Sequence, residues 1–212
     1  MIAPAAALLD LQFFLIEFAV LIASLTVHEA AHAITADRLG DPTARQLGRV
    51  SLNPVVHIDP IGTILLPILS MFSPVPLLGW AKPVPVNLSR LRHPRRDFMI
   101  IAAAGPISNL LQAIAIAVVY QALFDLYDRD FLARVLSYAV RMNLALAFFN
   151  LIPIPPLDGG NVLAGLVPEN AARMLDQVRQ FGFLALYALL LSGVLTTLIV
   201  PPTDFFWRLL LR

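Results

Sequence analysis

Long apolar stretches dominate the sequence. The four longest cover residues 11–36, 98–124, 131–151 and 181–200. A helix rises about 1.5 Å per residue, so about 20 residues cross a hydrocarbon layer that is about 30 Å thick. We therefore expect four transmembrane helices. The first should be retained as a span, because it lacks the basic segment and the cleavage site of a signal peptide.

Three other segments do not fit a spanning helix. Residues 61–72 are apolar, but this run is interrupted by a proline and is too short to cross. Residues 47–60 mix β-branched residues with prolines, and residues 74–87 are rich in proline, which favours short strands and turns. The predicted fold class is an all-α polytopic membrane protein with about four transmembrane helices, a re-entrant segment and a small β-rich element on the cytoplasmic side.

The composition supports a single membrane-embedded domain over residues 1–212. Apolar residues make up 58% of the chain and charged residues 14%, and the mean hydropathy is +0.77. No polar stretch approaches the roughly 80 to 100 residues that a folded soluble domain needs. The net charge of +1, without a basic face, argues against nucleic-acid binding. Because the chain has no cysteine, any metal must be held by His, Asp, Glu or Asn.

The distribution of basic residues predicts how the chain is oriented, because Lys and Arg are retained on the cytoplasmic side of a membrane. Eight of the fifteen basic residues lie between positions 37 and 96, whereas residues 125–130 carry three Asp and one Arg. Positions 37 and 96 therefore share the cytoplasmic side, and residues 61–72 must enter the membrane and return. We expect a multi-pass cell-membrane protein.

One motif places metal-ligating side chains at helical spacing. His28-Glu29-Ala30-Ala31-His32 stands near the cytoplasmic end of the first span. Residues four apart lie on one face of a helix, so both imidazoles can reach one ion while Glu29 approaches a water bound to it. The alternative is a pair of helix-face histidines satisfied by backbone or water, which is costly near the hydrocarbon boundary.

A catalytic zinc site usually has three protein ligands, so a third must come from elsewhere in the chain. Asp158 is the best candidate, because prolines and a glycine pair turn the chain around it at the cytoplasmic end of the span at 131–151. It could instead cap a helix. His57 and Asp59 compete for the same role, although each equally suits a turn. His93, among four arginines, is expected to be solvated.

Three motifs occur in an order that resembles the site-2 protease family of intramembrane zinc metalloproteases. They are the HExxH motif at 28–32, the segment Ala-Gly-Pro-Ile-Ser-Asn at 104–109, and an asparagine followed by the Pro- and Gly-rich residues 153–160. The resemblance covers about residues 11–165. It implies zinc (Zn2+) bound by His28, His32 and Asp158. It further implies Glu29 as general base and acid, and Asn150 as a residue that binds substrate backbone or stabilises an oxyanion. Unlike many relatives, this chain has no inserted PDZ domain and no appended CBS pair.

The resemblance implies a zinc endopeptidase that cuts membrane-anchored proteins in or near their transmembrane helices, for regulated intramembrane proteolysis or for clearance of signal-peptide remnants. Its partners would be transmembrane substrates and the lipid bilayer, with a separate adaptor as one route to substrate selection and the oligomeric state open. One alternative is a catalytically silent metal-binding scaffold, which would have no need of Glu29. The other is a metal or proton transporter, which would spread ionisable residues through several spans.

Further expectations concern residues around these motifs. The extended segment at 82–87 either pairs with unwound substrate as an added strand or covers the site as a structural loop. If it pairs, the substrate-contacting residues are Lys82, Val84, Val86 and Asn87. Gly105-Pro106 is best explained as a packing kink in its span. Similar depth along the first and third spans predicts an ion pair between Glu17 and Arg141.

Overall fold

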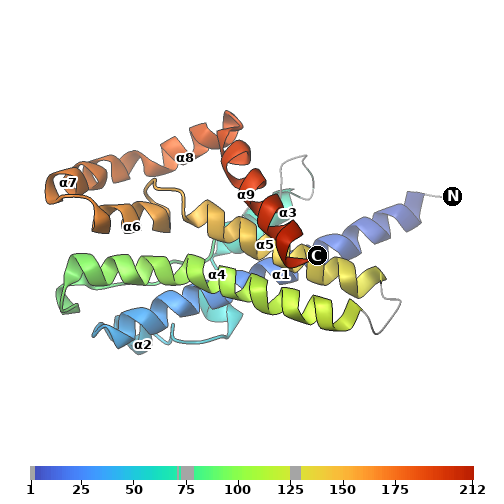
Figure 1. The fold of residues 1–212 in the computed structure, drawn as a ribbon, viewed down its shortest axis with the longest axis horizontal. Helices are drawn as coiled ribbons and strands as arrows, with labels where there is room; N and C mark the ends of the chain where they lie inside the picture. The colour runs from blue at the N-terminus through green and yellow to red at the C-terminus, as the bar shows by residue number, and fades with distance from the viewer. Residues whose placement is uncertain (1–2, 71, 73–78, 125–129) are drawn as a thin grey trace.

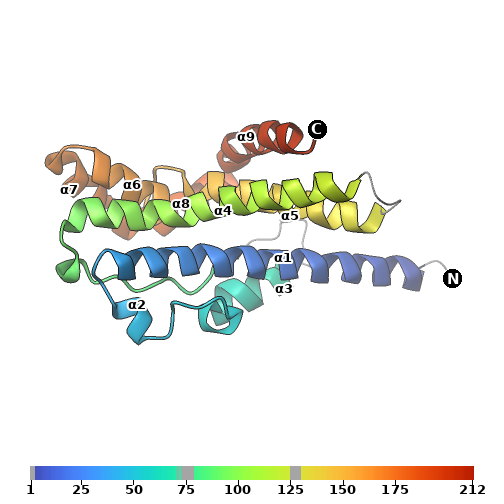
Figure 2. The same cartoon turned by 60° about the horizontal axis from the view of Figure 1, so that its bottom comes forward.

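Three long helices form the centre of the molecule. The computed structural model describes residues 3–70, 72, 79–124 and 130–212. The helices α1 (Ala3–Arg38), α4 (Pro94–Phe124) and α5 (Asp130–Asn150) lie side by side and alternate in direction (Figures 1 and 2). Each holds a stretch long and apolar enough to cross a membrane, at Leu11–Arg38, Pro94–Leu123 and Phe131–Asn150. These stretches correspond to three of the four predicted spans.

The fourth predicted span, at 181–200, is a broken helix. It consists of α8 (Gly182–Leu191) and the first part of α9 (Val194–Leu210), which are bent by 75° relative to each other. The break falls at Gly193, whose φ of 75° lies in the left-handed region that glycine adopts without steric cost. The described residues therefore hold three spanning helices, or four if the bent pair forms one span.

Short elements connect α1 to α4. They are α2 (Thr43–Gln46), the 3-10 helix η1 (Pro54–His57), the π-helix η2 (Pro60–Leu65), α3 (Leu66–Ser70) and the 3-10 helix η3 (Leu88–Arg90). Figure 2 shows α2 and α3 on the side of α1 opposite α4. The apolar helical stretch Pro60–Leu69 is too short to span, as the sequence predicts. Its re-entrant path stays a prediction.

The prediction of a β-rich element is wrong for the part of the chain that the structure describes, where no residue forms a strand. Residues 79–87 are extended, but their donors bond singly to other segments. Trp80 N–H donates to the Gly62 carbonyl at 3.2 Å, and Lys82 N–H to the His57 carbonyl at 2.8 Å. Pro83 and Pro85 have no N–H, so a continuous ladder cannot form. Residues 74–78 of the expected element lie outside the described residues.

Small side chains allow α4 and α5 to pack closely. Ala113 and Ala117 of α4 meet Val140 and Leu144 of α5, and all four are at most 2% exposed. Without a hydrophobic driving force between helices in lipid, such close contact and interhelical hydrogen bonds hold a bundle together. The indole N–H of Trp207 on α9 adds one such bond, to Ser137 Oγ at 3.1 Å.

After α5 the chain turns back along the bundle. It forms α6 (Asp158–Leu166), α7 (Glu169–Val178) and the 3-10 helix η4 (Arg179–Phe181) before α8. In Figure 1, α6 lies along the half of α4 where α4 begins, and α9 crosses α5 further along. The first residue of α6 is thereby brought to the depth at which α1 carries its histidines.

The ion pair predicted between Glu17 and Arg141 is wrong. Arg141 Nη2 instead lies 2.7 Å from Asp204 Oδ1 on α9. Depth along α1 and α5 could not reveal that α9 crosses α5 and brings the Asp204 carboxylate to Arg141.

Candidate metal centre

The residues of the HExxH motif lie buried in the second half of α1. His28, Glu29 and His32 are 4%, 8% and 8% exposed. The one-turn spacing brings both imidazoles to the same point, with their Nε2 atoms 3.0 Å apart. The ring planes are nearly perpendicular, at 85°. Both Nε2 atoms therefore approach one position from different directions.

Asp158, the first residue of α6, reaches the same position. Its Oδ2 atom lies 3.2 Å from His28 Nε2 and 3.4 Å from His32 Nε2. Together with the 3.0 Å separation of the two nitrogens, these distances make a nearly equilateral triangle of three ligand-type atoms. In a tetrahedral site with metal–ligand distances of about 2.0 to 2.1 Å, two ligand atoms are about 3.3 Å apart. The triangle therefore has the size of one face of a zinc tetrahedron.

The hydrogen bonds around this triangle also fit a cation. Asp158 Oδ2 is buried and accepts no hydrogen bond from the described residues. His32 Nδ1 lies 2.7 Å from the Ile101 carbonyl oxygen, which can only accept, so Nδ1 carries the proton. In the neutral imidazole, His32 Nε2 then presents a lone pair towards Asp158. Acceptors that face one another at such distances suit a divalent ion held by nitrogen and oxygen.

The turn that delivers Asp158 depends on two glycines. A Cβ on Gly159 would lie 2.3 Å from the Leu151 carbonyl oxygen, and one on Gly160 would lie 2.5 Å from Pro155 N. Neither position has room for a side chain. The alternative that Asp158 caps a helix does not describe the structure, because Leu157 is the N-cap residue of α6 and no side chain caps it.

Gly105 lets α4 approach the two histidines. A Cβ there would lie 2.4 Å from His32 Nε2 and 2.5 Å from His28 Nε2. The sequence favoured a packing kink at Gly105-Pro106, whereas the structure gives Gly105 a steric role at the histidine pair. Pro106, the next residue, is fully buried within α4.

Glu29 lies beside the triangle and contacts the extended segment. One of its carboxylate oxygens lies within 4.8 Å of a ligand atom of each histidine. Its Oε2 atom accepts a hydrogen bond from Val84 N–H at 3.1 Å. The segment at 82–87 therefore runs next to α1 at the level of the motif. Val84 and Val86 are half-buried in it, while Lys82 and Asn87 are exposed.

Two buried charged residues anchor the ends of this segment. Arg49, 5% exposed, donates to the Lys82 carbonyl oxygen. Burial lowers the pKa of the Arg49 guanidinium, and the negative charge of Glu29 opposes this effect. At the other end, the fully buried carboxylate of Asp41 accepts from Asn87 N–H at 2.6 Å and from Thr43 N–H at 3.1 Å. Burial disfavours the charge on Asp41, but the hydrogen bonds outweigh it and lower its pKa.

The competing ligand candidates have other partners. His57 is 2% exposed, and its Nε2 lies 2.8 Å from the Ser51 carbonyl oxygen. Asp59 caps η2 by accepting from Ile61 N–H and Gly62 N–H. His93 is exposed. Asp158 is the described carboxylate that lies within 4 Å of both histidine Nε2 atoms.

Asn150, the last residue of α5, makes a local contact. Its Nδ2 donates to the Leu146 carbonyl oxygen at 3.0 Å, one turn back in the same helix. The catalytic role expected of Asn150 stays a prediction.

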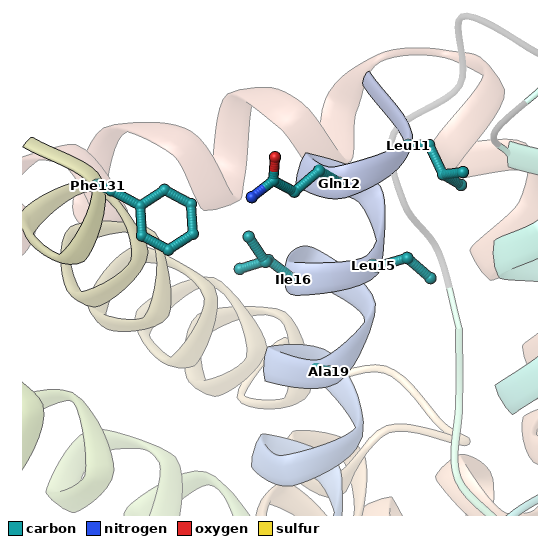
Figure 3. A pocket seen from close by; sticks show the side chains of 6 residues that line it. All are labelled: Leu11, Gln12, Leu15, Ile16, Ala19 and Phe131. Carbon is teal, nitrogen blue, oxygen red and sulfur yellow. The ribbon is translucent and has the colours of Figure 1, made fainter. Parts of the chain in front are cut away.

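An apolar groove lies far from the motif, towards the beginning of α1. It has a volume of about 450 Å³ and is lined by Leu11, Gln12, Leu15, Ile16, Ala19 and Phe131 (Figure 3). Gln12 precedes His28 by sixteen residues, which is about 24 Å along a helix. This groove therefore has no part in the metal centre.

Two asparagines that the sequence did not assign to the centre form a hydrogen-bonded chain that ends at His28. Asn109 Oδ1 lies 2.6 Å from His28 Nδ1, and Asn109 bonds in turn to Asn143. The available signal was an amide side chain in each of two apolar spans, since a buried amide is costly unless it is bonded. Arg49 gave no such signal, because arginines are frequent in its region of the sequence.

Comparison with known proteins yields relatives from several bacteria. Residues 124–193 match Peptidase family M50. YwhC of Bacillus subtilis is 37% identical over 179 residues, which cover 81% of this chain and 78% of the relative. Rip2 of Mycolicibacterium smegmatis is 31% identical, with 86% of this chain and 69% of the relative covered. Rip2 of Mycobacterium tuberculosis is 31% identical, with 81% and 65% covered.

The names of these relatives assign them to the zinc metalloproteases. No solved structure matches the chain. The extent of the similarity, the buried His-Glu-His cluster and the apolar helices agree on one family and one metal, Zn2+. The chain belongs to Peptidase family M50, the site-2 protease family of membrane-embedded zinc metalloproteases.

Proposed function

We propose that this protein is an intramembrane endopeptidase that hydrolyses peptide bonds in or near the transmembrane helices of membrane-anchored substrates. His28, His32 and Asp158 hold the zinc ion, and Glu29 acts as general base and then general acid. The observation that carries this proposal is the position of Glu29, buried beside the ligand triangle but outside it. A metal site that served only structure would have no use for a carboxylate there.

The roles of the side chains follow from their positions. When bound, zinc polarises a peptide carbonyl and acidifies a water molecule. Glu29 accepts the proton of the attacking water at a carboxylate oxygen and returns it to the leaving nitrogen. The Val84 N–H, which donates to Glu29 Oε2, orients this carboxylate. Asn150 stands at the end of α5, where we assign it the role of binding substrate backbone or stabilising the oxyanion.

Substrate must arrive as extended chain, because the carbonyls of an intact helix are engaged in its hydrogen-bond ladder. The segment at 82–87 is suited to receive it. The backbone donors of Lys82 and Val84 already have partners, and Pro83 and Pro85 have no N–H to offer. In contrast, the carbonyl oxygens of residues 83–86 accept no hydrogen bond from the described residues. An unwound substrate would therefore donate its own N–H groups to these carbonyls, with Lys82, Val84, Val86 and Asn87 as contacts.

The proposed orientation places the centre towards the cytoplasm. The basic residues that precede and begin α4 lie at the end of the bundle where α1 ends, which is the end closer to the histidines. Lys and Arg favour the cytoplasmic side. Selection among substrates would then fall to residues near the segment at 82–87 or to a separate adaptor.

The decisive experiment compares wild type with Glu29→Gln and His28→Ala on a single-span substrate in liposomes, with bound zinc measured in each sample. We expect Glu29→Gln to keep zinc and lose cleavage, and His28→Ala to lose both. Cleavage that survived Glu29→Gln would refute the mechanism. A wild-type protein that bound zinc but cleaved no membrane substrate would favour the scaffold alternative.

A further inference from the structure

A chain of buried polar side chains leads away from His28 through three helices. His28 Nδ1 lies 2.6 Å from Asn109 Oδ1 on α4. Asn109 Nδ2 donates to Asn143 Oδ1 on α5 at 2.9 Å. Asn143 Nδ2 donates both to Ser24 Oγ on α1 and to the Ala139 carbonyl oxygen, each at 3.0 Å. Asn109, Asn143 and Ser24 are 0%, 1% and 2% exposed.

One end of this chain fixes the direction of every bond in it. The Ala139 carbonyl can only accept, so the atom of Asn143 that faces it must be the amide nitrogen. The oxygen of Asn143 then faces Asn109, which must donate with its own amide nitrogen. The oxygen of Asn109 in turn faces His28 Nδ1, which must carry a proton. A backbone carbonyl on α5 thus determines which nitrogen of an imidazole on α1 is protonated.

We propose that Asn109 and Asn143 are positioning residues that hold His28 in the tautomer with its proton on Nδ1, so that Nε2 has a free lone pair for zinc. This inference rests on the proposed role of His28 as a ligand. His32 obtains the same tautomer directly, from the Ile101 carbonyl. Among the described residues, no backbone carbonyl contacts His28 Nδ1. The two asparagines instead link His28 to the Ala139 carbonyl, which sets the direction of the hydrogen bonds between them.

The surroundings make this arrangement hard to reverse. Turning the Asn109 amide over would place its nitrogen against His28 Nδ1 and its oxygen against Asn143 Oδ1. These side chains are almost fully buried, and two oxygens facing each other without a donor are costly in such a place. Partners behind a ligating histidine typically change metal affinity by 10- to 100-fold when they are removed.

The test uses metal-free and zinc-titrated protein in detergent. Histidine labelled with 15N distinguishes a protonated from an unprotonated ring nitrogen at a pH where the imidazoles are neutral, and competition with a chromophoric chelator gives zinc affinity. We expect a protonated Nδ1 at His28 in wild type. Asn109→Leu should weaken zinc binding about 10- to 100-fold. Asn143→Leu, which frees the Asn109 amide to turn, should produce a mixture of His28 tautomers and a smaller loss.

Two further variants separate positioning from packing. Asn109→Asp keeps an oxygen that accepts from His28 Nδ1 and, with its buried carboxyl protonated, an O–H that donates to Asn143 Oδ1, so it should retain most of the zinc affinity lost in Asn109→Leu. Gln112→Leu is the matched control: it makes the same kind of change three residues along α4, at an amide whose Nε2 is buried without a hydrogen-bond partner among the described residues. It should leave both zinc affinity and the His28 tautomer unchanged.

The proposal is overturned if wild-type His28 carries its proton on Nε2, or if Asn109→Leu binds zinc as tightly as Gln112→Leu. If Asn109→Leu does not fold, the wild-type tautomer and the spectrum of Asn143→Leu still decide the matter. Cleavage is not a readout here. A protein that bound zinc through His28 but cut no substrate would sink the proposed function and leave this inference standing.

Discussion

Replacing Gly105 by alanine should remove zinc from the protein without unfolding it. The added Cβ would lie 2.4 Å from His32 Nε2 and 2.5 Å from His28 Nε2, whereas ordinary contact begins at 3.4 Å. The overlap is therefore about 1 Å at both nitrogens. Metal–ligand distances tolerate deviations of about 0.2 Å. The new methyl group also stands close to where a metal bound by both nitrogens would lie, since such bonds are about 2.0 to 2.1 Å long.

We expect Gly105→Ala to lower bound zinc from about one ion per chain to nearly none and to abolish cleavage. Overpacking of this size typically costs about 1–3 kcal/mol of stability. The matched control is Gly165→Ala, whose Cβ would lie 2.5 Å from Met99 Cβ, also on α4 but away from the histidines. It should lose comparable stability and keep its zinc. Metal analysis of the purified proteins, with thermal unfolding in detergent, measures both effects. Full zinc content in Gly105→Ala would refute the steric role of Gly105.

Two other predictions concern the extended segment. Val84→Pro removes the N–H that donates to Glu29 Oε2, and a hydrogen bond to a charged group is worth about 1.5–3 kcal/mol, so cleavage should fall about ten- to a hundredfold with zinc retained. Val84→Ala keeps the N–H and is the control; equal activity of the two variants would contradict the role of this bond. Asp41 has a lowered pKa in the folded state, so its ionised carboxylate stabilises the protein above the unfolded pKa of about 3.9, and this stability is lost as the pH falls through the folded pKa. The difference in thermal stability between wild type and Asp41→Asn should therefore be constant from about pH 5 to 8 and should shrink below about pH 4. A difference that grew on acidification would show that Asp41 is not the group responsible.

The sequence by itself determined the membrane class, three of the spans and the HExxH motif that brings two histidines and a glutamate together. Apolar runs of 20 residues or more leave few alternatives to a spanning helix, because the backbone must satisfy its own hydrogen bonds in lipid. The spacing of His28 and His32 fixes their common face through helix geometry alone. Asp158 could be named as the best third candidate, since the span before it ends on the side of the histidines, but the sequence left His57 and Asp59 as competitors.

Other features depended on contacts between segments distant in sequence. The approach of Asp204 to Arg141 follows from how α9 crosses α5, which hydropathy does not encode. The extended segment looked like a strand, but its donors went to Glu29 and Asp41 rather than to another strand.

The metal centre combines features that the sequence predicts with features that depend on tertiary structure. Sequence spacing could align His28 and His32, because both belong to one helix and share its local geometry. Only the tertiary structure could decide that Gly105 lies against their nitrogens and that Asn109 and Asn143 stand behind His28. Steric contacts and hydrogen bonds act only over a few ångströms. The side chains that make them come this close only because α1, α4 and α5 pack together.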